Sequence, residues 1–208
     1  YKRQDLSTVT ITRLLNEPII RPDLDPSIGE NIQGPSVIKV PEWVDDPLGD
    51  YYLYFADHKG LYIRLAYADD LLGPWTIHPP GSLEIQDSYF LAEPPAVSSD
   101  VAERLRASQE RRGVPMSHDG LFEATTPHIA SPDVQVDHQN QRIVMYFHGL
   151  DDVSTQLSRV ATSSDGIHFD ARPEQLGRSY MRIFHHDGYT YSMAMPGQFY
   201  RSRDPLGN

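Results

Sequence analysis

The chain has 208 residues, 39% of them hydrophobic, which is enough to bury the core of one domain. It carries 18 Lys and Arg against 29 Asp and Glu, and the formal charge of −11 repels phosphate backbones and argues against nucleic acid as the main partner. The absence of cysteine excludes disulfide frameworks and thiolate metal sites, and no apolar run reaches the roughly 18 residues that a membrane span needs.

Strand signals dominate the chain: short runs rich in β-branched and aromatic residues, most of them bounded by Gly, Pro, Asp or Asn. In chain order they are SVIKV (36–40), YYLYFA (51–56), LYIRLAYA (61–68), DVQV (133–136), RIVMYF (142–147), LSRVATS (157–163), YMRIF (180–184) and YTYSMAM (189–195). One stretch, 98–113, is typical of a short surface helix, with Ser98 or Ser99 as its cap and Gly113 at its end.

The strand segments repeat along the chain. The pairs are GPSVIKV (34–40) with SPDVQVD (131–137), YLYFADH (52–58) with VMYFHGL (144–150), and RLAYADDLLGPW (64–75) with RVATSSDGIHF (159–169), and a third copy runs from RSYMRIF (178–184) to YRSRDPLG (200–207). Trp75 and Phe169 close two of these copies, and we expect them to be structural plugs between neighbouring units. Arg64 and Arg159 occupy equivalent positions, which favours structural ion pairs with Asp70 or Asp165.

A repeat of about four antiparallel strands cannot bury both of its faces alone, and radial stacking of such units gives a β-propeller. A β-sandwich is the alternative, because it also uses regularly spaced short strands. The prediction is one all-β propeller domain. Its parts are an N-terminal strand (8–33), a blade (34–88), a helical insertion (89–126), a second blade (127–170) and a partial blade (178–208).

A family resemblance is carried by NEPIIRP (16–22), NIQGPSVIKVPEWV (31–44) and GDYYLYFADHKGLYIRLAYADDLLGPW (49–75). These segments resemble five-bladed propeller glycoside hydrolases of families 43 and 117, and above all bacterial proteins described as glycosyl hydrolase family 43-like. The resemblance covers most of 16–207 apart from the insertion. It implies a five-bladed fold, incomplete in this chain because a whole domain needs roughly 250–330 residues. A further chain segment or a homo-oligomer would then complete the propeller.

The resemblance also implies a function. It predicts a carbohydrate-active protein that cleaves glycosidic bonds of an oligosaccharide or polysaccharide by carboxylate chemistry in an axial funnel. It requires no cofactor and allows an axial calcium or other ion. A membrane or nucleic-acid partner is not expected. The compartment stays open between bacterial periplasm, secretion and cytoplasm, because a signal segment can be removed before the sequence begins.

Two catalytic positions depart from the pattern of the resembled families, in which a carboxylate stands before a proline at the start of an inner strand. Here Gly34 precedes Pro35 and Ser131 precedes Pro132, and neither residue can act as an acid or base. The family's catalytic residues therefore cannot be carried over. A non-catalytic carbohydrate-binding propeller remains as the alternative function, and a propeller for protein interaction is a third interpretation.

Nearby acids are substitute candidates for catalysis. Strand alternation places Asp133 on the same face as Ser131, although it could simply bind backbone N–H groups. Asp57 and His58 follow a strand; His58 could act as a general acid oriented by Asp57. Their alternative is a hairpin turn in which Gly60 supplies the positive φ. Glu123, after the insertion, is a further candidate general acid.

Substrate-binding candidates share a polar side chain near the start or end of a predicted inner or second strand. Amides and imidazoles suit sugar hydroxyls, and a guanidinium suits the carboxylate of a uronic acid. For the guanidinium an inter-blade salt bridge is the alternative. The candidates are Asn31, Gln33, His128, His148 and Arg182.

Overall fold

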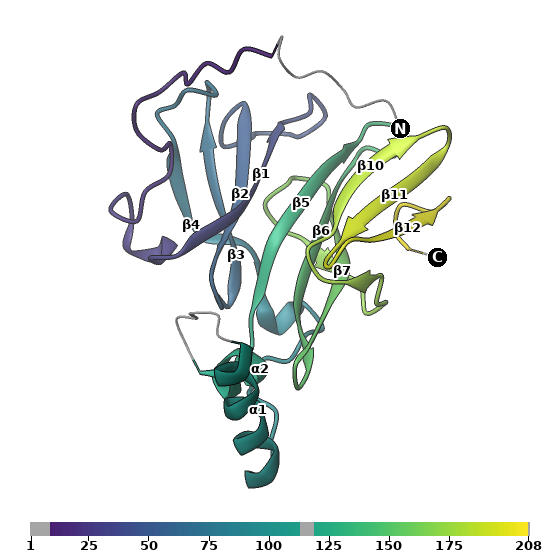
Figure 1. The fold of residues 1–208 in the computed structure, drawn as a ribbon. Helices are drawn as coiled ribbons and strands as arrows, with labels where there is room; N and C mark the ends of the chain where they lie inside the picture. The colour runs from purple at the N-terminus through teal and green to yellow at the C-terminus, as the bar shows by residue number, and fades with distance from the viewer. Residues whose placement is uncertain (1–8, 113–118, 208) are drawn as a thin grey trace.

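The structure, a computed structural model, describes residues 9–112 and 119–207 and consists of three antiparallel sheets side by side (Figure 1). The first sheet has the order β1-β2-β3-β4, the second β5-β6-β7-β8 with β9 also paired to β7, and the third β10-β11-β12. The strands are β1 (Ile32–Lys39), β2 (Tyr51–Asp57), β3 (Tyr62–Ala68), β4 (Thr76–Glu84), β5 (Ile129–Asp137), β6 (Arg142–Asp152), β7 (Thr155–Ser163), β8 (Asp170–Ala171), β9 (Gly177–Arg178), β10 (Arg182–His186), β11 (Tyr189–Ala194) and β12 (Gln198–Ser202).

Each strand expected from its apolar run is present within a few residues of the expected bounds. β4 shows no strand signal of its own, because it contains Pro79, Pro80 and Gly81. Proline cannot donate to a ladder, and β4 tolerates two of them since it is the edge strand of the first sheet.

The sheets stack on one another through apolar cores. Between the first and second sheets lies the largest cluster, which includes Tyr54, Phe147 and Phe169. Phe169 packs edge-on against Tyr54 with ring centroids 5.7 Å apart, as expected for a plug between blades. A smaller cluster around Tyr146 and Leu206 joins the second sheet to the third.

The N-terminal segment covers the outer face of the first sheet. Ile20 and Ile28 pack there against Leu53 and Phe55, and Trp75 belongs to the same cluster. The strand predicted within 8–33 is found only from Ile32 onward, so that prediction is wrong over 9–31. Prolines at 18, 22 and 26 remove backbone donors, and a short 3-10 helix, η1 (Pro26–Ile28), forms in place of a strand.

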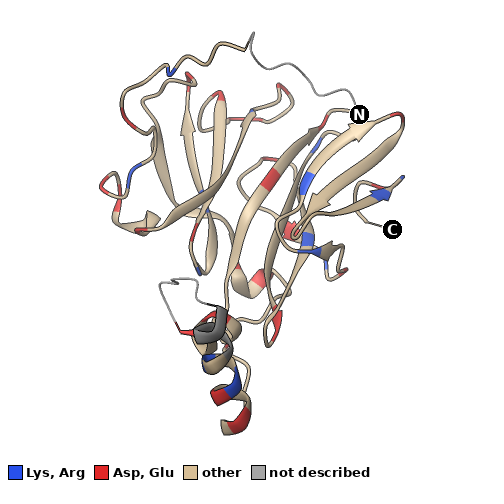
Figure 2. Cartoon of the chain, in the orientation of Figure 1, with Lys and Arg blue, Asp and Glu red and all other residues tan. Residues whose placement is uncertain are grey.

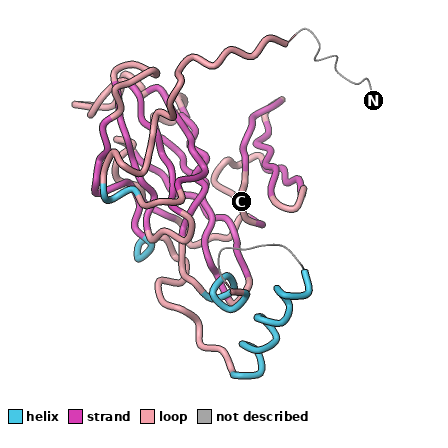
Figure 3. The backbone as a smooth tube through the Cα atoms, turned by 60° about the vertical axis from the view of Figure 1, so that its left-hand side comes forward, coloured by secondary structure: helices cyan, strands magenta, loops and turns pink. Residues whose placement is uncertain are grey.

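The insertion forms two helices, α1 (Ser99–Arg112) and α2 (Gly120–Thr125), which lie together below the sheets (Figures 1 and 3). The predicted helix is confirmed as α1, and its expected end at Gly113 lies outside the described residues. No separate sequence signal marks α2, which begins where Asp119 accepts a hydrogen bond from the Phe122 N–H. A second 3-10 helix, η2 (Ile85–Asp87), follows β4.

The second blade extends beyond the predicted limit at residue 170, because β8 and β9 together pair along β7 as its fourth strand. Sheets of about four antiparallel strands, stacked face to face with β1 beside β5, are the arrangement of a β-propeller. In the turned view the third sheet stands apart from the other two (Figure 3). Acidic residues are spread over the loops and helices (Figure 2).

Candidate functional site

The site begins where the inner strands β1 and β5 are interrupted by bulges. Gly34 and Ser131 both have a left-handed backbone, with φ of 63° and 51°, and the ladder register shifts at each of them. A Cβ added to Gly34 would lie 2.7 Å from the Ser131 Cα. The two positions that carry carboxylates in the resembled families therefore touch each other here, and this contact requires glycine at position 34.

The third sheet offers an equivalent position. Tyr180 stands just before β10 and also has a positive φ, of 61°. Met181 and Ile183 follow it as Pro132 and Val134 follow Ser131. Gly34, Ser131 and Tyr180 thus occupy the same place in three successive sheets, and none of them is an acid.

Asp133 does not face the same neighbour as Ser131. Its carboxylate accepts hydrogen bonds from the Ile183 N–H (2.7 Å) and the Gln135 side chain (2.8 Å), so it binds the third sheet, whereas Ser131 contacts Gly34 of the first. The expectation from strict strand alternation is wrong because the bulge at Ser131 breaks the alternation between the two residues.

Arg182 binds the same bulge from the third sheet. Its Nη1 donates to the carbonyl oxygens of Ser131 (3.3 Å) and Pro132 (3.1 Å). The predicted inter-blade salt bridge is replaced by a contact from a guanidinium to carbonyl groups. It satisfies backbone acceptors that the bulge leaves without ladder partners.

Glu123 lies on α2 against the turn that follows β2. Its carboxylate is 3.3 Å from the Lys59 Nζ and 3.7 Å from the His58 Nε2, and Lys59 also donates to the Glu123 carbonyl at 3.1 Å. Burial lowers the pKa of Lys59, and the Glu123 carboxylate partly opposes that shift. The Gln33 side chain is 3.3 Å from the His58 Nδ1. Three predicted residues, Gln33, His58 and Glu123, are thus brought together.

Two buried histidines lie behind this group. The rings of His128 and His148 meet edge-on with centroids 5.9 Å apart, and Tyr180 lies over His148 at 4.2 Å. Burial, with a smaller contribution from Lys59, lowers the pKa of His128 to about 4. Burial and neighbouring His128 lower the pKa of His148 to about 3. Neither ring nitrogen of His148 has a hydrogen-bond partner among the described residues.

Tyr180 links these histidines to Glu123. The residue is 38% exposed, and burial together with the Glu123 carboxylate raises the pKa of its hydroxyl. We call this set of side chains the axial cluster, because Gln33 adjoins the bulge residue Gly34 and Tyr180 occupies the equivalent position before β10. Its members are Gln33, His58, Lys59, Glu123, His128, His148 and Tyr180.

Asp57 is separate from the axial cluster. Its carboxylate accepts a hydrogen bond from the Asn31 N–H (2.8 Å) and lies 4.0 Å from the Arg64 Nη2. Asp57 therefore holds the N-terminal segment onto β2, and Asn31 contributes its backbone to that contact. The predicted turn after β2 is present, but Lys59, with φ of 60°, supplies the positive φ that was expected of Gly60.

The predicted partners of the two repeated arginines are also wrong. Arg64 lies beside Asp57 rather than Asp70, and Arg159 forms an ion pair with Asp151 at 3.0 Å. Asp70 and Asp165 instead accept hydrogen bonds from backbone N–H groups of their own turns. Short Asp side chains in turns prefer these local donors.

Lys59 and Tyr180 were not predicted as site residues. A lysine in a hairpin turn is usually exposed to solvent, so the sequence gives no signal for Lys59. The signal for Tyr180 was present, because aligning SYMRIF (179–184) with ASPDVQ (130–135) places Tyr180 on Ser131. Over 9–112 and 119–207, no group of three or more His, Asp or Glu side chains is placed to hold a metal ion, and an axial ion stays a prediction. No helix in this part of the chain is long and apolar enough to cross a membrane.

Comparisons with known proteins place the fold among glycoside hydrolases. The chain has a TM-score of 0.50 with a thermostable family-43 glycoside hydrolase, at 12% identity, covering 89% of this chain and 55% of that one. CoXyl43, a GH43 β-xylosidase/α-arabinofuranosidase from a compost microbial metagenome, gives 0.49 at 15% identity, over 85% and 44%. Zg3597, a family 117 glycoside hydrolase from Zobellia galactanivorans, gives 0.45 at 12% identity, over 85% and 54%. Identity this low shows the fold alone.

A sequence relative is also known. The chain is 36% identical over 188 residues to uncharacterized protein R118 of Acanthamoeba polyphaga mimivirus, covering 86% of this chain and 46% of that protein. No family model matches the chain. The chain spans about half the length of the relative and of the solved structures it matches.

Proposed function

We propose that this is a carbohydrate-active protein whose sugar-binding site is the axial cluster. The observation that carries the proposal is the placement of Tyr180. Tyr180 is partly exposed and stands in the third sheet at the position that matches Gly34 and Ser131. Its ring lies on His148, and the Glu123 carboxylate is close enough to raise the pKa of the tyrosine hydroxyl. An aromatic face beside hydrogen-bonding side chains is the combination that a sugar ring, with its apolar faces and hydroxyl edge, requires.

The polar members of the axial cluster complement the ring. The Gln33 amide, the His58 imidazole and the Glu123 carboxylate lie within hydrogen-bonding or near hydrogen-bonding distance of one another. Together they offer both donors and acceptors, which can exchange their mutual contacts for sugar hydroxyls. The side chain of Lys59, almost fully buried, lies 3.3 Å from the Glu123 carboxylate.

Glycosidic bond hydrolysis is a second candidate, favoured by the contact between Glu123 and His58. The Glu123 carboxylate beside Lys59 suits the base or nucleophile role, and an imidazole can donate the proton to the leaving oxygen. Glycosidases hold their two catalytic groups roughly 5–9.5 Å apart, whereas His58 and Glu123 are 3.7 Å apart. Hydrolysis therefore requires these side chains to separate when the substrate enters, and binding is the function that the observed geometry favours.

The test measures binding and cleavage in parallel. Isothermal titration with xylotriose and β-1,3-galactotriose, and a reducing-sugar assay on the same compounds, are applied to the wild type and to Tyr180→Gly and Glu123→Gln. Glycine fits the positive φ of position 180, so the first variant removes the ring without strain. The exposed substitution Glu93→Gln is the matched control for charge.

The proposal predicts that Tyr180→Gly and Glu123→Gln each weaken binding roughly tenfold while Glu93→Gln has no effect. Cleavage that Glu123→Gln abolishes would establish the second candidate. Wild-type affinity in both axial variants, or no binding of either trisaccharide at millimolar concentration, would overturn the proposal.

A further inference from the structure

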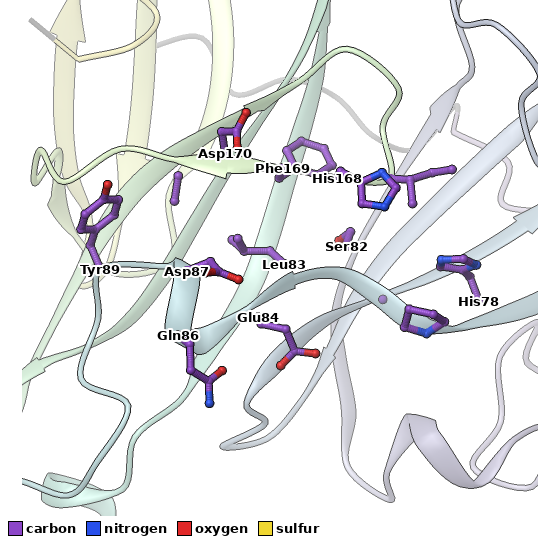
Figure 4. A pocket seen from close by; sticks show the side chains of 14 residues that line it. His78, Ser82, Leu83, Glu84, Gln86, Asp87, Tyr89, His168, Phe169 and Asp170 are labelled. Carbon is purple, nitrogen blue, oxygen red and sulfur yellow. The ribbon is translucent and has the colours of Figure 1, made fainter.

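A groove of about 670 Å³ lies on the outer side of the first two blades, away from the inner strands. One wall is the end of β4 together with η2, and the other is the segment 167–171, which ends in β8 (Figure 4). The buried side chains of Leu83 and Phe169 belong to its lining. A hydrogen bond from the Phe169 N–H to the Ser82 carbonyl (3.3 Å) joins the two walls at the base.

An exposed tyrosine with a strained backbone stands at one end of this groove. Tyr89 has φ of 62°, a conformation that a bulky side chain rarely adopts, and 57% of its surface is exposed. Ser88 and Phe90 on either side of it are buried, and the Ser88 hydroxyl bonds both the Ile85 carbonyl (2.6 Å) and the Phe90 N–H (3.2 Å). The chain therefore holds the Tyr89 ring in solvent at the expense of backbone strain, which is a feature of binding sites.

The opposite wall presents a fixed imidazole. The Asp165 carboxylate accepts hydrogen bonds from the Ile167 N–H (2.7 Å), the His168 N–H (2.8 Å) and the His168 Nδ1 (2.8 Å). These bonds lower the pKa of Asp165 to about 2 against the opposing effect of burial. These bonds brace the turn, and the exposed His168 ring is bonded at Nδ1 with its Nε2 on the far side of the ring.

The remaining polar groups are spread along the groove and do not converge on one point. Gln86, Asp87 and Glu84 come from one wall and Asp170 from the other (Figure 4). The fourteen described residues that line the groove include no Lys or Arg. This arrangement does not suit an anionic sugar, and the spread of acceptors and donors does not suit a single cation.

From these observations we infer that the groove is a second carbohydrate-binding site, taking a neutral oligosaccharide that stacks on Tyr89. A sugar ring would place one apolar face on the exposed tyrosine, and its hydroxyls would meet Gln86, Asp87, Asp170 and His168. The groove lies on the fourth strands of the blades, where the axial cluster has no member, so the inference does not rest on the function proposed for the axial cluster.

The test uses chemical-shift perturbation of the ¹⁵N-labelled protein with cellotriose, mannotriose and chitotriose. Tyr89→Gly removes the ring at a position where glycine relieves strain, so this variant is expected to fold. Phe199→Ala, which removes a similarly exposed aromatic ring on β12, is the matched control. Glu123→Gln reports on the axial cluster separately.

The inference predicts that at least one trisaccharide perturbs amides of 82–89 and 167–171. The affinity followed at these groove amides should fall roughly tenfold in Tyr89→Gly and stay unchanged in Phe199→Ala. In Glu123→Gln the affinity at the groove amides should also stay unchanged, whatever happens at the axial cluster. It is overturned if no trisaccharide perturbs these amides at millimolar concentration, or if Tyr89→Gly binds as the wild type does. It is also overturned if spermine, a cation, perturbs these amides while every sugar leaves them unchanged.

Discussion

Ser36 and Asp133 occupy the same position in successive blades and make the same inter-blade contact. The Ser36 hydroxyl accepts a hydrogen bond from the Val134 N–H at 2.9 Å, and the Asp133 carboxylate accepts one from the Ile183 N–H at 2.7 Å. Each side chain therefore fixes the inner strand of the next sheet. The repetition identifies Asp133 as an inter-blade acceptor, because a residue with no acid function makes the same bond one blade earlier.

Replacing Asp133 should affect stability rather than ligand binding. Asp133→Ala leaves the Ile183 N–H without its acceptor in a partly buried place, which costs about 1–3 kcal/mol in the free energy of unfolding. Asp133→Asn keeps an oxygen for that donor and should cost less. Urea denaturation measures both, with the exposed Asp45→Ala as control. Loss of sugar binding in a fully folded Asp133→Asn would contradict this assignment.

Because Gly34 and Ser131 are in contact, we expect a single added methyl group at position 34 to destabilise the fold strongly. In Gly34→Ala the new Cβ would lie 2.7 Å from the Ser131 Cα, on a backbone that already disfavours a side chain. Gly188→Ala is the matched control, since its φ of 72° carries the same conformational penalty but nothing lies within 4 Å.

Gly188→Ala should cost about 1 kcal/mol, the penalty for a left-handed alanine. Gly34→Ala should exceed it by about 1–3 kcal/mol, because backbone must move to admit the methyl group. Differential scanning calorimetry of the two variants gives the comparison. Equal destabilisation would show that the bulges of β1 and β5 do not touch in solution.

The strands and their repetition were predictable because most are short runs of β-branched and aromatic residues bounded by turn residues. The bulges were not predictable, because Ser and Tyr are not residues that usually mark a left-handed backbone. A single left-handed residue changes the face of the sheet to which the following side chains point. The gathering of Gln33, His58, Glu123 and the histidines followed from their places near strand ends. Which acid faced the axis depended on hydrogen bonds to neighbouring sheets, which no local pattern encodes.

Lys59 should hold α2 against the turn that follows β2. Lys59→Met keeps the length of a nearly buried side chain but removes the cation 3.3 Å from the Glu123 carboxylate and the donor to the Glu123 carbonyl. We expect a loss of about 1–3 kcal/mol in unfolding free energy, measured by urea denaturation. Lys39→Met, at an exposed position on β1, should leave the unfolding free energy unchanged. A Lys59→Met variant as stable as the wild type would rule out this contact as a tie between α2 and the first sheet.

Because His128 and His148 are buried, we expect acid to destabilise the fold at pH values above the range in which carboxylates titrate. Burial lowers the pKa of His148 to about 3 and that of His128 to about 4, whereas both groups titrate near 6.5 in the unfolded chain. Between those values the unfolded state binds more protons, so stability rises with pH and is lost as pH falls from about 6.5 toward the folded pKa values.

Each such group contributes a slope of up to about 1.4 kcal/mol per pH unit within that window. His148→Phe keeps an aromatic ring against Tyr180 and His128 but removes the titrating nitrogens, which have no hydrogen-bond partner among the described residues. We expect the unfolding free energy of this variant to depend less steeply on pH, by the contribution of one histidine, between about pH 6.5 and about pH 4.5. Urea unfolding at a series of pH values measures this dependence. His186→Phe, at the exposed end of β10, should keep the wild-type slope. If His148→Phe keeps it as well, the imidazole must take up its proton in the folded protein, and its burial beneath Tyr180 would have to be relieved by water or ligand at the axial cluster.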